Sequence, residues 1–167
     1  MAARTTLRAV VEDLIPRAEL LRIDLGVTRQ DDAHLRTPEV DLHAIMRNLV
    51  DNAIRYSPAG SRVDVSLSGD GSGARFEVAN GGSGIARDQQ ERVFDPFYRI
   101  LGTETEGSGL GLSIVKTLVE RAGGSVTLHP LSPEAPLPGL RVRVQFPMSA
   151  KNCQPEAREA LSTKDGR

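Results

Sequence analysis

The chain of 167 residues is 39% apolar and 26% charged and has a formal net charge of -1, which fits one globular domain with its own core. This balance, without a basic stripe among aromatic residues, excludes an electrostatic binder of nucleic acid. The single cysteine excludes an internal disulfide, and no apolar run reaches the roughly 18–20 residues that cross a bilayer. Because no signal peptide is recognisable, we expect a cytoplasmic domain without membrane contact of its own.

The first elements along the chain are a helix and a strand. Residues 6–21 carry an apolar helical stripe, which Pro16 should kink or divide into two short pieces. Apolar residues alternate over 23–27, as in a strand. Residues 33–36 are expected to add a short partner strand after a turn.

A second helix and a hairpin should follow. The helix is predicted to start near Pro38 with Thr37 as its N-cap, and to end by Ser57 because the next residue is proline. Two alternating runs at 63–67 and 74–78 flank the sequence GDGSG, which predicts a β-hairpin.

The remaining elements complete an α/β pattern. They are a loop at 80–86, a short helix at 87–94, irregular chain at 95–107, a helix at 109–122, and strands at 125–129 and 140–146. The polar residues 148–167 predict a disordered tail after a domain of residues 1–147. The expected fold is a two-layer α/β (α+β) sandwich: a mixed, mainly antiparallel sheet of about five strands with helices on one face.

Four short motifs carry the chemistry. They are RNLVDNAIRYSP at 47–58, NGGSGI at 80–85, VFDPFYR at 93–99 and GSGLGLSIVK at 107–116. Together they describe a nucleotide site, with a helix that carries carboxamides, a loop for a flat base, a lid and a phosphate cradle.

The carboxamides and glycines explain why these motifs suit a nucleotide. Asn48 and Asn52 are four residues apart, so their side chains share a helix face, and amide oxygens are suitable ligands for magnesium bridging phosphates. Gly82 and Gly84 permit positive φ and close approach to a base. Further glycines precede a helix N-terminus, where free N–H groups attract phosphate: Gly107, Gly109 and Gly111.

In this order and spacing, the motifs closely resemble the ATP-binding catalytic domain of bacterial sensor histidine kinases. The resemblance covers about residues 6–147 and implies the Bergerat-type ATP-binding fold with ATP and Mg2+ as cofactors. It also implies transfer of the γ-phosphoryl group to a histidine on a dimerisation domain that is absent from this chain. A response regulator would be a further partner, and the parent protein would be anchored in the bacterial inner membrane.

The resemblance assigns a role to each motif. It implies that Asn52 coordinates magnesium with Asn48 beside it, that Arg55 reaches phosphate, and that Tyr56 stacks on adenine. Phe97 lies in the motif that anchors one end of the lid, and we expect it either in the core or in contact with the nucleotide. The other implied nucleotide contacts are Asn80, Gly82, Gly84, Ile85, Gly107, Ser108, Gly109, Leu110, Gly111 and Leu112.

One position departs from the family pattern. The family usually has aspartate where this chain has Asn80, and that aspartate accepts a hydrogen bond from the adenine amino group. The asparagine oxygen can still accept, but a neutral acceptor is weaker than a charged one. We therefore expect ATP affinity to be lower by about tenfold rather than lost.

The chain lacks the phosphoacceptor half of the reaction. HLRTP at 34–38 resembles a phosphoacceptor motif, but it has no acidic residue after His34 and leaves no room for a helical hairpin before Asn48. His43 and His129 have no partner motif. Ala44 occupies a position where some kinases carry glutamate, so we identify no general base in this chain.

Two other functions fit parts of the pattern. An anti-sigma-factor-type serine kinase would have this fold and size, although VFDPFYR and IRYSP argue against it. A degenerate module that binds partners without catalysis is favoured only by Asn80. A chaperone or topoisomerase would need a further transducer domain.

Overall fold

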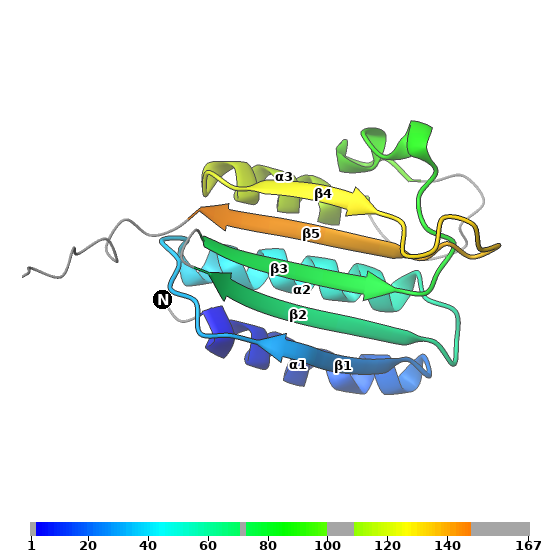
Figure 1. The fold of residues 1–167 in the computed structure, drawn as a ribbon, viewed down its shortest axis with the longest axis horizontal. Helices are drawn as coiled ribbons and strands as arrows, with labels where there is room; N and C mark the ends of the chain where they lie inside the picture. The colour runs from blue at the N-terminus through cyan, green and yellow to red at the C-terminus, as the bar shows by residue number, and fades with distance from the viewer. Residues whose placement is uncertain (1–2, 71–72, 100–108, 148–167) are drawn as a thin grey trace, which may run out of the picture.

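A five-stranded sheet with three α-helices on one face makes up the fold (Figure 1). The computed structural model describes residues 3–70, 73–99 and 109–147. In chain order the elements are α1 (Ala3–Leu20), β1 (Asp24–Gln30), α2 (Glu39–Arg55), β2 (Arg62–Asp70), β3 (Gly73–Asn80), the 3-10 turns η1 (Arg87–Gln89) and η2 (Arg92–Phe94), α3 (Gly111–Arg121), β4 (Ser125–His129) and β5 (Leu140–Pro147).

The sheet is mixed, as predicted, with strand order β1-β2-β3-β5-β4. The β1–β2 pair is parallel, because α2 returns the chain between these strands, and all other pairs are antiparallel. The predicted hairpin is confirmed: β2 pairs with β3 in a register that sets Val65 opposite Val78. Asn80 at the end of β3 lies opposite Leu140 at the start of β5.

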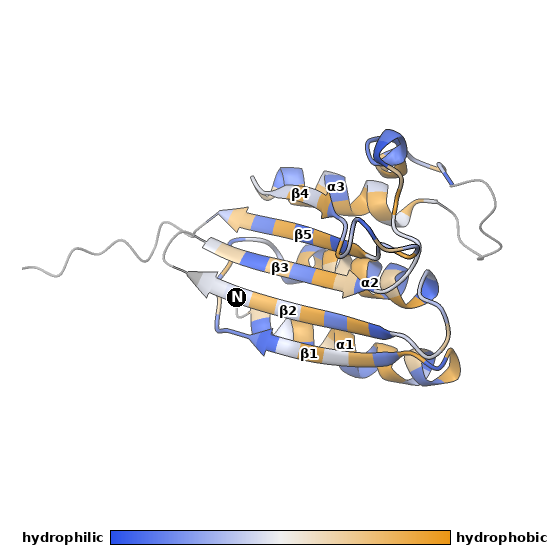
Figure 2. Ribbon diagram, turned by 45° about the vertical axis from the view of Figure 1, so that its right-hand side comes forward, coloured by the Kyte–Doolittle hydropathy of each residue, from blue (hydrophilic) through white to orange (hydrophobic). Residues whose placement is uncertain are grey.

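The core lies between the sheet and the helices. Strand alternation places Val65, Phe76 and Val144 on the inner face, where they are fully buried. Leu7 of α1 and Ile45 of α2 cover them with no exposed surface of their own. Figure 2 shows the same alternation as apolar and polar bands along the strands, in front of the amphipathic helices.

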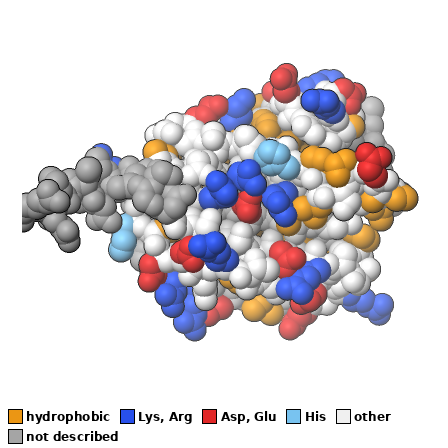
Figure 3. Space-filling model, viewed as in Figure 1, with side chains coloured by type: hydrophobic (Ala, Val, Ile, Leu, Met, Phe, Trp, Pro, Cys, Tyr) orange, Lys and Arg blue, Asp and Glu red, His pale blue; other side chains and the backbone are white. Residues whose placement is uncertain are grey.

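The outer face of the sheet carries charged side chains of both signs (Figure 3). Two pairs are closely bonded: Arg143 to Glu77, with Nε and Oε1 2.6 Å apart, and Arg62 to Asp64, with Nε and Oδ1 2.6 Å apart. In these two pairs the opposite charges compensate one another locally.

Two details of the N-terminal helices differ from expectation. Pro16 does not divide α1 into two pieces, because this residue is on the solvent side and the carbonyl of Glu12, which loses its amide partner, can be hydrated. Thr37 is not the N-cap of α2: Pro38 holds that position, its carbonyl oxygen accepts from the Leu42 amide at 3.0 Å, and no side-chain cap bond forms there among the described residues.

Two smaller expectations also change. In place of a strand over 33–36, only His34 forms an isolated bridge. The predicted helix over 87–94 is instead the two short turns η1 and η2, separated by two residues. The predicted tail and residues 100–107 of the irregular segment predicted over 95–107 lie outside the described residues.

Gly124→Ala should destabilise the fold. A Cβ at Gly124 would overlap the carbonyl oxygen of Gln145 and come within 3.2 Å of a methyl group of Val119, so β4 could not keep its place beside β5. We expect a loss of about 1–3 kcal/mol in the free energy of unfolding, measured by chemical denaturation. Gly81→Ala is the control, because its nearest neighbour would be Ser61 Cβ at 4.0 Å. Equal denaturation midpoints for the two variants would contradict this packing.

Candidate functional site

A cavity of about 390 Å³ lies where β3 ends and β5 begins, bounded by α2, the segment after β3 and the start of α3. The sequence-predicted residues that line it are Asn48, Asn52, Arg55, Tyr56, Asn80, Gly84, Ile85, Gly109, Gly111 and Leu112. The cavity therefore joins residues from all four motifs that the sequence singled out, although VFDPFYR contributes Val93, Tyr98 and Arg99 rather than the predicted Phe97.

One face of α2 forms the wall that carries the carboxamides. Asn48, Asn52 and Tyr56 follow one another at spacings of four, and Arg55 comes three residues after Asn52, so the four form one stripe. The side-chain nitrogen of Asn48 donates to the carbonyl oxygen of Ala44 at 2.7 Å. Since only the nitrogen can donate, the amide oxygen of Asn48 is the atom left for another partner.

The carboxamides meet α3 at its first residue. A Cβ on Gly111 would lie 3.2 Å from Oδ1 of Asn48 and 3.3 Å from Nδ2 of Asn52. A side chain at this position would require the two carboxamides to shift by a few tenths of an ångström. The first turn of α3 has no side-chain cap among the described residues, so its backbone N–H groups are available to an anion in the cavity.

Asn80 lies deep in the site. Strand alternation puts its side chain on the same face as Phe76 and Val78, and it is 5% exposed. Its surroundings are tightly packed. A Cβ on Gly82 would lie 3.1 Å from Nδ2 of Asn80 and 2.5 Å from the carbonyl oxygen of Tyr56.

Gly82 and Gly84 both hold the loop after β3 in place, but only Gly84 lines the cavity. Gly84 lines the cavity at φ 70°, where a side chain would be strained and would lie 2.8 Å from the carbonyl oxygen of Gly139. Gly82 is buried beside the cavity, and its carbonyl oxygen accepts from the amide of Gly139 at 2.9 Å. The proline-rich loop before β5 thus holds this loop in place.

Phe97 and Leu110 are predicted site residues that do not line the cavity. Phe97 is 71% exposed at φ 64°, and its amide donates to the carbonyl oxygen of Gly109 at 3.1 Å. Its backbone therefore braces the glycine loop, while the side chain is neither core nor cavity wall. Leu110 is the N-cap of α3. Gly107 and Ser108 lie outside the described residues.

Sequence reasoning missed several cavity residues. Asp51 lies on the wall and forms an ion pair with Arg55, with Oδ2 and Nη2 2.9 Å apart, a pairing that the spacing of four could have indicated. Tyr98 also lines the cavity and carries the guanidinium of Arg92 4.7 Å above its ring. Gln89 had no sequence signal, because its place depends on the turns η1 and η2.

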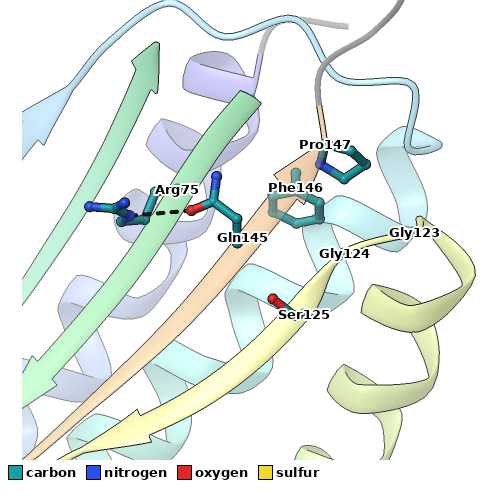
Figure 4. A pocket seen from close by; sticks show the side chains of 7 residues that line it. All are labelled: Arg75, Gly123, Gly124, Ser125, Gln145, Phe146 and Pro147. Carbon is teal, nitrogen blue, oxygen red and sulfur yellow. Dashed lines mark hydrogen bonds between the residues drawn. The ribbon is translucent and has the colours of Figure 1, made fainter. Parts of the chain in front are cut away.

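A second, shallower hollow of about 450 Å³ lies at the opposite end of the sheet (Figure 4). It is bordered by the turn at Gly123 and Gly124 and by the end of β5, and Arg75 donates to Gln145 there at 3.3 Å. It brings together no second titratable side chain, so we assign no chemistry to it.

The described residues also limit how a metal could be held. They contain no group of three or more histidine, cysteine, aspartate or glutamate side chains placed to hold a metal ion. A cation in this cavity would therefore rely on the amide oxygens of Asn48 and Asn52 and on oxygens of a bound ligand. Within the described part of the chain, none of the helices has the length and apolar character needed to span a membrane.

The chain belongs to the histidine kinase-, DNA gyrase B- and HSP90-like ATPase family, whose profile matches residues 37–150. It is 39% identical over 121 residues to the sensor protein QseC of Escherichia coli K12, which covers 72% of this chain and 26% of that protein. It is also 36% identical over 126 residues to the sensor protein kinase PmrB of Pseudomonas aeruginosa. That match covers 73% of this chain and 26% of PmrB.

The fold agrees with this family. The mycobacterial sensor histidine kinase MprB is similar with a TM-score of 0.79 and 29% identity, over 88% of this chain and 95% of that one. The chain spans about a quarter of the length of the curated relatives it matches. The predicted recognition is confirmed: this is an ATPase domain of the sensor histidine kinase type.

Gly111→Ala should impair ATP binding without loss of stability. The added Cβ would push against both carboxamides, while alanine is a better helix former than glycine at this position. We expect about tenfold weaker binding by calorimetry, equal to about 1.4 kcal/mol, and an unchanged or raised melting temperature. Ser113→Ala, in the same turn but outside the cavity wall, should bind as the parent does. Parental affinity in Gly111→Ala would mean that the contact has no role in binding.

Proposed function

We propose that this domain binds ATP with Mg2+ and donates the γ-phosphoryl group to a histidine on a separate dimerisation domain, as the catalytic part of a two-component sensor histidine kinase. The observation that carries the proposal is the convergence of Asn48 and Asn52 on Gly111 at the N-terminus of α3. A pair of amide oxygens and a row of backbone N–H groups are complementary to a metal-bound polyphosphate.

The cavity residues divide into two groups in this proposal. Asn52 and Asn48 hold Mg2+, which would neutralise negative charge on the phosphates when bound, and Arg55 and the first turn of α3 bind phosphate oxygens. At the other end, Tyr56, which is 42% exposed, offers its ring to adenine, and Asn80 accepts from the amino group. Catalysis then consists of positioning and charge neutralisation.

The acceptor must come from outside this domain. His34, His43 and His129 are all the histidines of the chain, and none of them lines the cavity. A histidine on a dimerisation domain is the acceptor that the sensor kinase relatives suggest. A response regulator as the next phosphoryl acceptor, and an inner-membrane anchor in the parent protein, belong to the same proposal.

Transfer can be tested by mixing this chain with the dimerisation domain of its parent kinase and radiolabelled ATP. We expect label on the dimerisation domain that is labile to acid and stable to base. Asn52→Ala should abolish the transfer because the metal then loses its main protein ligand. Acid-stable label would indicate a serine kinase, and a parent chain that binds no ATP at millimolar concentration would indicate a non-catalytic module.

Asn80→Asp should strengthen ATP binding by about tenfold, because a charged acceptor replaces a neutral one at a buried position. The measurement is calorimetry with ATP and with the triphosphate of purine riboside, which lacks the amino group. The gain should appear with ATP alone. An equal gain with both ligands, or none with ATP, would remove Asn80 from base recognition.

A further inference from the structure

Asp51 is shared between two arginines that come from different helices. Its Oδ2 accepts from Nη2 of Arg55 on α2 at 2.9 Å, and its Oδ1 lies 3.1 Å from Nε of Arg17 on α1. The Asp51 and Arg55 side chains are each 21% exposed, and that of Arg17 is 46% exposed. The carboxylate thus accepts a hydrogen bond from Arg55 at one oxygen and forms an ion pair with Arg17 at the other.

The three groups differ in their access to the cavity. Asp51 and Arg55 line it, whereas Arg17 does not. Nε of Arg55 is buried and has no hydrogen-bond partner among the described residues, so part of this guanidinium remains uncommitted beside the cavity. An unpartnered buried N–H is costly unless a ligand engages it.

The summed charge of the three groups determines how strongly this side of the cavity attracts an anion. The charges of Arg55 and Asp51 alone sum to zero, and the carboxylate would offset part of the attraction of the guanidinium for a phosphate. With Arg17 the sum becomes +1, because the second arginine compensates the carboxylate from behind. The partly buried setting limits the screening of this effect by solvent.

We infer that Arg17, outside the cavity, is a positioning residue for the phosphates of the nucleotide: it engages Asp51 so that the charge of Arg55 is available to the ligand. The inference rests on the proposed function. It gives α1, which contributes no residue to the cavity wall, a specific part in ligand binding.

A second ion pair between the same helices supplies a matched control. Nη1 of Arg47 on α2 lies 3.5 Å from Oδ2 of Asp13 on α1, and neither residue lines the cavity. The side chain of Arg47 is 48% exposed, close to the value for Arg17. Any general effect of losing an arginine between α1 and α2 should appear in both variants.

The test compares the affinities for Mg-ATP and for adenosine by calorimetry, with the melting temperature of each variant. Arg17→Ala should weaken Mg-ATP binding about threefold, as expected for one partly exposed charge interaction, and leave adenosine binding unchanged. Arg47→Ala should change neither affinity. Arg17→Lys, which keeps the charge, should stay within about twofold of the parent.

The double variant Arg17→Ala with Asp51→Asn provides the sharpest outcome. It restores the summed charge of +1, so Mg-ATP affinity should return to within about twofold of the parent. Equal losses in Arg17→Ala and Arg47→Ala, equal losses for both ligands, or no recovery in the double variant would overturn the inference. Failure of the parent chain to bind Mg-ATP would overturn the proposed function itself.

Discussion

The close approach of α2 and α3 at Gly111 is the constraint on which the site depends. The apolar faces of the two helices pack on the same sheet, and this brings the N-terminus of α3 against the carboxamides of Asn48 and Asn52. A side chain at this position would displace the carboxamides, so the amide pair that suits a cation and the free N–H groups that suit an anion would no longer keep their present spacing. Core packing and site geometry are therefore one arrangement, since the residues that bury α3, Val115 and Val119, also set its N-terminus.

Much of the fold could be predicted because its signals are local. Alternation in β2 and β3, and a helical stripe in α2, are properties of short segments, and the order of elements then favours a mixed sheet. Thr37 and Pro38 show the limit of such reasoning, since choosing between neighbouring cap positions needs backbone angles that composition does not reveal. The turns η1 and η2 were missed for a related reason: few apolar residues anchor them, so tertiary contacts decide their form.

The candidate site was predictable where a residue type has one evident use, and unpredictable where its neighbours decide its use. Paired asparagines and glycines before a helix indicate their chemistry directly, and the structure brings most of them to one cavity. Phe97 was expected in the core or at the ligand, but a backbone bond to Gly109 holds it at positive φ with its ring exposed. The sharing of Asp51 by Arg17 and Arg55 joins residues from two helices, and such a contact cannot be inferred from one segment.

The site also combines two parts that are held in place in different ways. The α2 stripe and Asn80 belong to elements buried on the sheet, so they are positioned before any ligand arrives. The segment after β3 is held differently, through the bond between Phe97 and Gly109 and the rings of Phe94 and Tyr98 beneath cationic side chains. Because the amide of Phe97 is bonded to the carbonyl oxygen of Gly109, the segment after β3 and the start of α3 are held together by a backbone contact outside any ligand.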